Sequence, residues 1–410
     1  MKPEVYISRQ QSYGCILCGR CCRRFYVLLR GEEVERLGKL DWGDEADVPT
    51  DFAEEIHGHP YFKRKPDGGC VFLDQDGACR MHRRFGFAKK ALTCRGYPFN
   101  IVSTFPGEIS VLARMDCPAV VRDAGKPIRE QKNDILQLVS ELHFGKGFTE
   151  TQLHGMSRDA VALLCAQCQH ILDDERLSMC DCARLLMSFA LRAEHLGGIF
   201  LNDPMMPTIY PSLIEGLRAS LADLPKYGIG PLRRSTFRQL LSCYCRRDEE
   251  LLDRGLSQRV RHAFQIARIV LGYGNLRRIG WEHPDFPIRK ARLFDGVART
   301  TPREVWSLYR KFLSVRLECF QFFGASYYGT DLFHGLKALF LTYPITLALA
   351  RLHAASRASE ELAAQDVEYA VLAMDHCHGR SPALNFSASR IRENELANHF
   401  TALVNILGRE

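Results

Sequence analysis

The amino-acid sequence predicts an α+β protein, in which a small, irregular cysteine-cluster domain with short hairpins packs on a larger all-helical domain. Three observations predict this class. Glycine and proline are dense in the first 125 residues, apolar residues recur at helical spacing from about residue 128, and eight of the 16 cysteines fall between Cys15 and Cys117. We therefore expect a cysteine-cluster domain at residues 1–125 and an all-helical domain at residues 126–410.

The composition excludes several classes of protein. The chain has 410 residues, of which 46% are hydrophobic and 25% charged, as in ordinary soluble globular proteins. The net charge of +7 is spread over this length and forms no strong basic stripe, so we expect no nucleic-acid partner.

No targeting or membrane-spanning segment is expected. Met1–Tyr6 lacks the basic start and apolar stretch of a secretory signal. The longest apolar run, Ala338–Ala350, contains Pro344 and is too short to cross a bilayer as a helix. These features predict a cytoplasmic protein with no membrane partner.

Two hairpins are expected in the first part of the chain. Cys70–Asp74 and Ala78–Met81 are joined through an Asp-Gly pair, which suits a tight turn. Phe99–Phe105 and Glu108–Met115 are joined in the same way through a Pro-Gly pair. Both hairpins place cysteines at or near strand ends.

Helices are expected where apolar residues recur at helical spacing. Arg30–Leu40 predicts a short amphipathic helix with Val34 and Leu37 facing inward. Farther along the chain, Thr301 is a suitable N-cap for a helix whose first residue is Pro302. The periodic segments beyond residue 175 are 176–197, 210–223, 233–245, 253–272, 302–323, 331–355, 360–377 and 388–407.

The strongest chemical signal is a run of four thiols within eight residues: Cys15, Cys18, Cys21 and Cys22. Gly19 lies inside this run and allows the backbone to fold around a common point. Thiolates at this density select zinc or iron–sulfur chemistry, because both prefer sulfur ligands. The alternative, in which the cysteines are small buried hydrophobic residues, suits such turn-flanked spacing poorly.

Four more thiols follow at turns or predicted hairpin ends: Cys70, Cys79, Cys94 and Cys117. In a reducing compartment, closely spaced thiols are more often metal ligands than disulfides. We predict that the first seven of the eight cysteines supply the ligands of one or two metal centres, with Cys117 as a further candidate. An iron–sulfur cluster of the 4Fe–4S type is favoured over zinc.

Basic residues are concentrated around the later cysteines. The segment between Gly77 and Gly107 contains no Asp or Glu and six basic residues, which are Arg80, Arg83, Arg84, Lys89, Lys90 and Arg95. Such side chains can stabilise a negatively charged thiolate cluster, bind an anionic ligand or lie in solvent, and all three alternatives stay open. His82 is either an imidazole ligand or an exposed basic residue.

Further cysteines in the helical part have a simpler interpretation. Cys165, Cys168, Cys180 and Cys182 are surrounded by apolar residues at helical spacing. We expect them to fill a helix interface rather than to form a second metal site.

The N-terminal motifs resemble the zinc- or iron-chelating CxxCxxCC cysteine-cluster family. The resemblance rests on Cys15–Arg23, Gly69–Asp74, Gly77–Cys79 and Thr93–Pro98, which follow the family's order and spacing over about the first 120 residues. Asp116–Ala119 and the long helical extension are similar to the flagellin lysine N-methylases. The first motif here is more closely spaced than in many of those methylases.

The second resemblance implies a protein-lysine N-methylase that transfers a methyl group from S-adenosylmethionine to surface lysines, with flagellin as a protein substrate. Tyr13 and Tyr97 are then candidates to hydrogen-bond the amine, and Arg23 and Arg95 are candidates to hold the donor's carboxylate. The alternative function is a non-enzymatic metal-binding or electron-transfer module that docks a partner protein.

Overall fold

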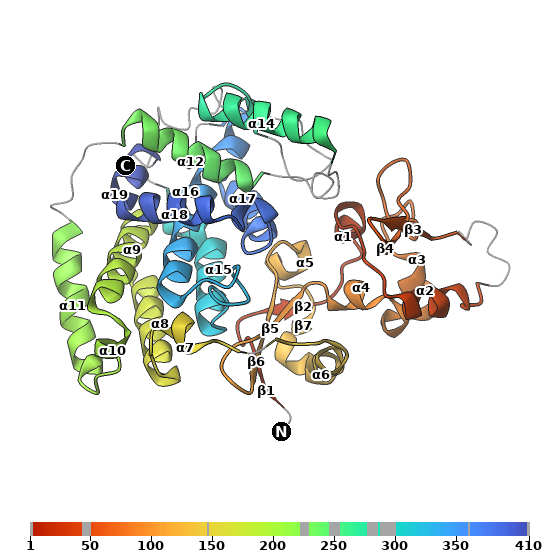
Figure 1. The fold of residues 1–410 in the computed structure, drawn as a ribbon, viewed down its shortest axis with the longest axis horizontal. Helices are drawn as coiled ribbons and strands as arrows, with labels where there is room; N and C mark the ends of the chain where they lie inside the picture. Colours follow the sequence, from red (N-terminus) through yellow and green to blue (C-terminus); the bar gives the residue numbers. More distant parts are fainter. Residues whose placement is uncertain are drawn as a thin grey trace.

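The computed structural model describes residues 3–42, 51–145, 147–221, 229–245, 255–276, 286–287, 301–359 and 361–407. Within them, an N-terminal part of small sheets and short helices precedes a mostly helical part (Figure 1). The predicted α+β class is confirmed.

A three-stranded sheet in the order β1-β6-β5 lies in the N-terminal part. β5 (Phe99–Ser103) and β6 (Glu108–Ala113) pair antiparallel, while β1 (Glu4–Ile7) pairs parallel with β6. Gly107 has a φ of 79° in the turn between β5 and β6, a conformation that glycine adopts without a steric penalty. The second predicted hairpin is therefore confirmed.

The other strands form two-stranded pairs. These are β2 (Ser12–Tyr13) with β7 (Lys126–Pro127), β3 (Ala53–Ile56) with β4 (His59–Phe62), and β8 (Asn275–Leu276) with β9 (Phe286–Pro287).

The first predicted hairpin is wrong, because neither Cys70–Asp74 nor Ala78–Met81 forms a strand. Leu73 and Cys79 are joined by an isolated bridge across the turn, and neither belongs to a named strand. The following residues form the helix α3 (Arg80–Phe85), which buries Met81 in the local hydrophobic core. Burial of this side chain outweighs two-stranded pairing, which is marginal in water on its own.

Short helices carry the cysteine motifs and their neighbours. The predicted helix at Arg30–Leu40 is confirmed, with Leu37 buried and Val34 packed against the local core. The helices of this part are α1 (Arg20–Arg24), α2 (Gly31–Gly38), α4 (Leu92–Gly96), α5 (Pro118–Val121) and α6 (Lys132–Glu141), with 3-10 turns η1 (Phe87–Lys89) and η2 (Ile128–Gln131).

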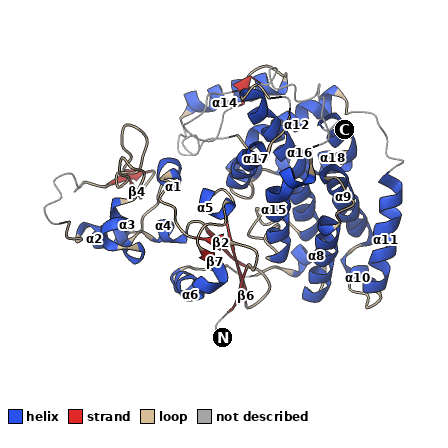
Figure 2. Cartoon of the chain, turned by 180° about the vertical axis from the view of Figure 1, so that it is seen from behind, coloured by secondary structure: helices blue, strands red, loops and turns tan. Residues whose placement is uncertain are grey.

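All eight periodic segments beyond residue 175 contain a helix, although residues 222–223, 253–254 and 360 lie outside the described residues. Figure 2 shows the long helices on one side of the molecule and α1–α4 on the other. The helices are α7 (Glu150–Leu153), α8 (Arg158–Asp173), α9 (Met179–Leu196), α10 (Gly198–Leu201), α11 (Met206–Ser220), α12 (Pro231–Cys243), α14 (Leu256–Val270), α15 (Ser307–Glu318), α16 (Leu332–Ser356), α17 (Ala364–Cys377), α18 (Ser387–Asn398) and α19 (Phe400–Leu407), with a 3-10 turn η6 (Pro382–Leu384).

The helix predicted to begin at Pro302 begins later. Pro302 precedes a 3-10 turn, η5 (Arg303–Trp306), and α15 starts at Ser307. The Arg303 guanidinium donates a 2.8 Å hydrogen bond to the Leu177 carbonyl, and Trp306 is buried. These two anchors hold the segment in the tighter turn before the α-helix starts.

The helix α16 lies at the centre of the helical part and packs against α9, α17 and α18. Among the described residues it is the one helix whose length and composition would suit a membrane span, and its most apolar window is entirely buried inside the protein. As the predicted segment 331–355 requires, the helix continues through Pro344. The surrounding helices enclose this residue, and their packing outweighs the lost backbone hydrogen bond.

Two main hydrophobic cores organise the chain. A local core around Phe72 gathers side chains between Val27 and Ala91, whereas the large core runs from Phe105 to Leu407. The predicted domain division at residue 125 stays a prediction. The cysteines expected at a helix interface are confirmed as buried residues of the large core, and they are Cys165, Cys168, Cys180 and Cys182.

Candidate metal centre

The eight N-terminal cysteines line two cavities that share part of their walls. The smaller one, the thiol cavity, measures about 40 Å³ and is lined by seven of them: Cys15, Cys18, Cys21, Cys22, Cys79, Cys94 and Cys117. The larger one, the aromatic cavity, measures about 270 Å³ and is lined by Cys21, Cys22, Cys70, Cys79 and Cys94. The fold therefore brings together thiols that lie up to about a hundred residues apart in sequence.

Gly19 brings the first cysteine motif against the turn that precedes Cys79. Its φ is 65°, and a Cβ added at Gly19 would lie 2.8 Å from the Gly77 carbonyl oxygen. This close approach requires glycine for both steric and backbone reasons. The Cys70 N–H then donates to the Cys22 carbonyl at 2.8 Å, which fixes a third segment on the same site.

The remaining thiols stand at the starts or within the first turns of short helices. Cys79 and Cys117 are the N-cap residues of α3 and α5, and Cys94 lies in α4. A helix start leaves backbone N–H groups without partners inside the helix, and these groups favour a thiolate nearby.

The sulfur atoms of Cys21 and Cys22 lie 3.9 Å apart. Two thiolates bound at about 2.3 Å to one tetrahedral zinc ion would lie roughly 3.8 Å apart. Among the described residues, however, no group of three or more His, Cys, Asp or Glu side chains is arranged to hold a metal ion. The donor set fits a thiophilic metal in chemistry, and closing the site requires further thiols to rotate toward this pair.

The three neighbouring thiols of Cys21, Cys22 and Cys79 have pKa values that are shifted in opposite directions. Hydrogen bonding with Cys22 lowers the pKa of Cys21 to about 7 and that of Cys79 to about 6. The same hydrogen bonds, together with burial, raise the pKa of Cys22 well above its ordinary value. The lowered pKa values favour the thiolate form of Cys21 and Cys79, which is the form that binds metal.

At Cys70, Cys94 and Cys117, burial raises the pKa of the thiol. It raises the pKa of Cys70 to about 12 and that of Cys117 to about 11, and it also raises the pKa of Cys94. These groups lose their protons only in exchange for a positive partner such as a metal ion.

Lys90 supplies positive charge on the walls of both cavities. Burial acts to lower its pKa, but the neighbouring thiols of Cys94, Cys79 and Cys21 outweigh burial and raise it. The ammonium group is therefore charged and compensates part of the negative charge of the thiolates. Of the three roles left open for the basic segment, stabilisation of a thiolate cluster is the one that this position supports.

His82 also lines the thiol cavity. Its Nδ1 atom is buried without a hydrogen-bond partner among the described residues, and burial and the Lys90 charge lower its pKa. A neutral imidazole with a free ring nitrogen can ligate a metal. The spacing Cys79-x-x-His82 was the sequence signal for this ligand, although the adjacent arginines also allowed an exposed side chain.

Tyr13 and Tyr97, the predicted amine-binding tyrosines, both line the thiol cavity. The Tyr97 hydroxyl donates to Asp116 Oδ1 at 3.2 Å, while the Tyr13 ring meets Phe99 edge-on at 5.5 Å between centroids. Burial raises the pKa of both phenols, so they act as neutral hydrogen-bonding groups.

Arg23 and Arg95, the predicted donor-binding arginines, are engaged elsewhere. Arg95 forms a forked ion pair with Glu141, with one contact of 2.9 Å, and Arg23 lies 3.6 Å from Asp67. Neither is among the residues that line the thiol cavity or the aromatic cavity. Their role in holding a methyl donor stays a prediction.

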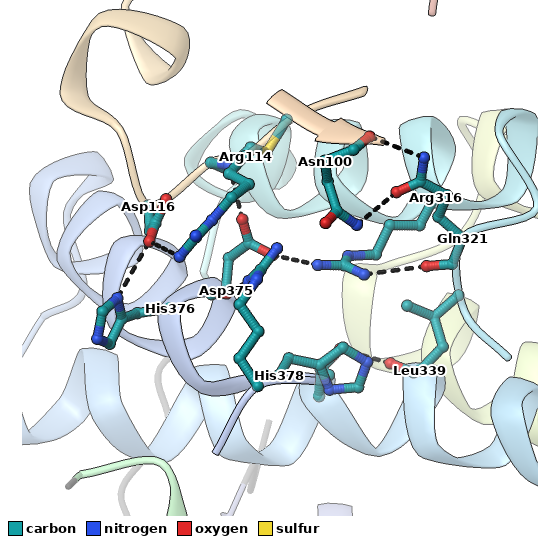
Figure 3. Close-up of polar contacts among 12 residues, drawn as sticks. Asn100, Arg114, Asp116, Arg316, Gln321, Leu339, Asp375, His376 and His378 are labelled. Atoms are coloured by element: carbon teal, nitrogen blue, oxygen red, sulfur yellow. Dashed lines mark hydrogen bonds and ion pairs between the residues drawn. The ribbon is translucent and has the colours of Figure 1, made fainter. Parts of the chain in front are cut away.

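A buried charge network connects the cysteine site to α17, and sequence interpretation missed it (Figure 3). Asp116 pairs with Arg114, and its Oδ2 atom accepts a 3.1 Å hydrogen bond from His376 Nδ1. Asp375 accepts the Met115 N–H at 2.6 Å and pairs with Arg316. The only sequence signal was a polar Asp-His pair directly after the apolar run at residues 370–374 of α17.

The comparisons with known proteins agree with this site. Residues 14–118 match the family model CxxCxxCC, described as "Putative zinc- or iron-chelating domain". This segment is similar to that family, and the rest of the chain lies outside the match. The match confirms the predicted cysteine-cluster resemblance for this segment, while the resemblance to flagellin lysine N-methylases stays a prediction.

An uncharacterized protein of Methanocaldococcus jannaschii is 26% identical to the chain over 155 residues. The aligned stretch covers 36% of this chain and 50% of the relative, so the chain spans about half the length of the curated relative that it matches. No solved structure matches the chain.

Proposed function

We propose that the CxxCxxCC domain holds one zinc or iron ion in a mononuclear thiolate site built around Cys21, Cys22 and Cys79. The 3.9 Å separation between the Cys21 and Cys22 sulfur atoms carries this proposal, because it matches one edge of a tetrahedral metal site. Cys79 lines the same cavity as Cys21 and Cys22, which supports the same grouping. The candidates for the fourth ligand are the remaining donors of the thiol cavity: Cys15, Cys18, Cys94, Cys117 and His82.

The geometry favours a mononuclear site over the 4Fe–4S cluster expected from the sequence. In such a cluster each cysteine binds a different iron atom, so the ligand sulfurs are held apart by the cluster itself. The short Cys21–Cys22 distance instead favours a shared ion. When bound, the metal would join the segments of α1, α3 and their neighbours and add its binding free energy to folding.

Metal and acid-labile sulfide analysis of protein purified without oxygen tests this proposal. We expect about one zinc or iron ion per chain and no acid-labile sulfide. Cys21→Ser and Cys22→Ser should lose the metal, whereas the matched control Cys243→Ala, on α12 in the helical part, should retain it. Sulfide in equal amount to iron would contradict the mononuclear site. A wild-type protein without metal would contradict the metal centre itself.

Lysine N-methylation from S-adenosylmethionine is a second candidate function, supported by the sequence resemblance and by the position of Tyr13 and Tyr97 at the thiol cavity. The transfer requires a neutral lysine amine in line with the methyl group, and a neutral phenol can accept the amine's hydrogen bond. Mass spectrometry of flagellin incubated with the metal-replete protein and the donor tests it. Tyr97→Phe should slow methylation if the enzyme function holds, and an unmodified flagellin would remove this candidate.

A further inference from the structure

The aromatic cavity extends beyond what a metal ion needs. It measures about 270 Å³, against about 40 Å³ for the thiol cavity, and the two share Cys21, Cys22, Cys79 and Cys94 as walls. A pocket of this size, lined mainly by apolar and aromatic side chains beside a chemical site, can hold a small-molecule ligand.

The volume sets the size of that occupant. An apolar protein cavity of about 150 Å³ stays dry and binds benzene. The aromatic cavity is nearly twice as large, so two fused rings fit where one ring would leave empty space.

The walls set its shape and polarity. The Phe25 and Tyr97 rings lie 4.9 Å apart between centroids and are tilted by 59°, and Phe62 and Phe72 pack edge-on at 5.2 Å. Other apolar and aromatic side chains complete the lining: Val27, Met81 and Phe99. Aromatic walls of this kind favour a planar aromatic guest, through stacking and edge-on contacts.

Arg114 supplies the charged group on the wall of the cavity. Its guanidinium lies 5.3 Å from the ring centroids of both Phe25 and Tyr97, and one of its terminal nitrogens pairs with Asp116. Its Nε atom is buried without a hydrogen-bond partner among the described residues. A buried donor without an acceptor is costly, and a ligand oxygen would satisfy it.

The charge balance around Arg114 favours an anionic ligand. The network in the described part of the chain contains three guanidinium groups and two carboxylates: Arg114, Arg316, Arg380, Asp116 and Asp375. A ligand carboxylate would offset this surplus of positive charge in a site of low polarity.

We propose that the aromatic cavity is a binding site for a small planar aromatic carboxylate of about two fused rings, held next to the thiol cluster. The rings lie between the aromatic walls, and the carboxylate accepts a hydrogen bond from Arg114 Nε. This inference goes beyond the metal centre, and it holds whether or not a metal occupies the thiols.

Calorimetric titration with 2-naphthoate tests the site on the full-length protein, with 2-naphthalenemethanol as the uncharged analogue. We expect saturable binding of 2-naphthoate to one site, and binding weaker by about tenfold or more for the alcohol. Equal affinity for the two probes would overturn the role of Arg114, and no saturable binding of either would overturn the site.

A plugged variant locates the binding in the cavity. Gly96 lines the aromatic cavity, and a Cβ added there meets nothing within 4 Å, so Gly96→Leu should fill the cavity without disturbing its walls. Gly38→Leu is the matched control, because Gly38 has the same open surroundings and lies on α2 outside the cavity. We expect Gly96→Leu to weaken 2-naphthoate binding by at least about tenfold and Gly38→Leu to leave it unchanged. Equal affinity in both variants would overturn the assignment.

Metal content measured on the same samples separates this inference from the metal centre. Protein that holds metal but does not bind 2-naphthoate contradicts the ligand site alone. Protein that binds 2-naphthoate without metal contradicts the metal centre alone.

Discussion

Lys90 is the residue whose charge best distinguishes a metal site from a group of buried cysteines. Its ammonium group lies on the walls of both cavities beside thiols from three segments, and those thiols raise its pKa. Small hydrophobic cysteines would gain nothing from a neighbouring cation, whereas thiolates bound to a metal would.

Lys90→Gln should therefore weaken metal binding by about tenfold or more, as measured by competition with a chelator. The exposed neighbour Lys89 provides the control, and Lys89→Gln should leave the affinity unchanged. If both variants bound metal as tightly as the wild type, the cation would have no part in the site.

Gly19→Ala tests the close approach that assembles the site. The left-handed conformation at Gly19 costs a non-glycine residue roughly 1–2 kcal/mol, and the new Cβ would also collide with the Gly77 carbonyl oxygen. We expect a lower free energy of unfolding together with loss of metal. Gly38→Ala, at the exposed end of α2, should change neither quantity. Normal metal content in Gly19→Ala would show that the approach is not required.

Single residues of the site were predictable from sequence only where the local pattern was dense. The close spacing of the four thiols from Cys15 to Cys22 predicted a ligand cluster. The structure places them with the four later cysteines around shared cavities. The partner roles of Lys90, Arg114 and Asp116 depend on contacts between distant segments. No local pattern could assign them.

At the scale of secondary-structure elements, the junction of α8 with α11 has a pH-sensitive ion pair. Asp174, the C-cap residue of α8, is paired with Arg176 at 2.9 Å and with Arg218 of α11. Its hydrogen bonds to Arg176 lower its pKa below the ordinary aspartate value. A lowered pKa in the folded state stabilises the protein above the unfolded pKa, and this contribution is lost as the pH falls.

Asp174→Asn should therefore lower the free energy of unfolding at pH 7 by about 1 kcal/mol. The difference in unfolding free energy between the variant and the wild type should shrink below about pH 4, because the stabilisation from the ionised Asp174 carboxylate is lost there. Urea unfolding at a series of pH values measures both. Asp173→Asn is the control, since the Asp173 side chain is largely exposed. A difference that stayed constant down to pH 3 would rule out the ion pair as its source.

Helices were predicted well where the hydrophobic periodicity extended over many residues. Elements were predicted poorly where local packing determined the secondary structure. The segment 331–355 gave α16 almost to its ends. The segment after Cys79 instead became α3, because burial of Met81 outweighed a short strand pairing. The helix α15 begins after Pro302 because a hydrogen bond from Arg303 to a distant carbonyl stabilises a 3-10 turn at this place. The capping pattern in the sequence carries no information about such a contact.

At the scale of the whole molecule, the cysteine site and the helical part are tied by buried charges. Asp375 of α17 accepts the backbone N–H of Met115, just beyond β6, and pairs with Arg316 of α15. Both side chains of the pair are almost fully buried. Removing one partner leaves the other charge uncompensated in an apolar setting.

Asp375→Asn should cost about 3 kcal/mol or more of unfolding free energy, measured by urea denaturation, because the Arg316 charge stays buried. The exposed Asp134 on α6 gives a control in Asp134→Asn, which should have little effect. The double variant Arg316→Met with Asp375→Leu should recover part of the loss. An unchanged stability in Asp375→Asn would show that the buried Asp375 carboxylate does not stabilise this junction.

The overall α+β class followed from turn density and helical periodicity, whereas the connection between the two parts did not. The large hydrophobic core begins at Phe105 and takes in Val120 before the helical segments start. Turn density is a local property, and membership of a shared core depends on tertiary packing. The same limit applies to the aromatic cavity, whose walls come from segments between Cys21 and Arg114.

X-ray absorption spectroscopy at the zinc or iron edge tests the mononuclear thiolate centre in the purified protein. We predict a first shell dominated by sulfur at about 2.3 Å, with no second metal atom nearby. The same spectrum of the Cys243→Ala control should be unchanged. A first shell of only oxygen and nitrogen, or a clear metal–metal distance, would contradict a single ion bound by Cys21, Cys22 and Cys79.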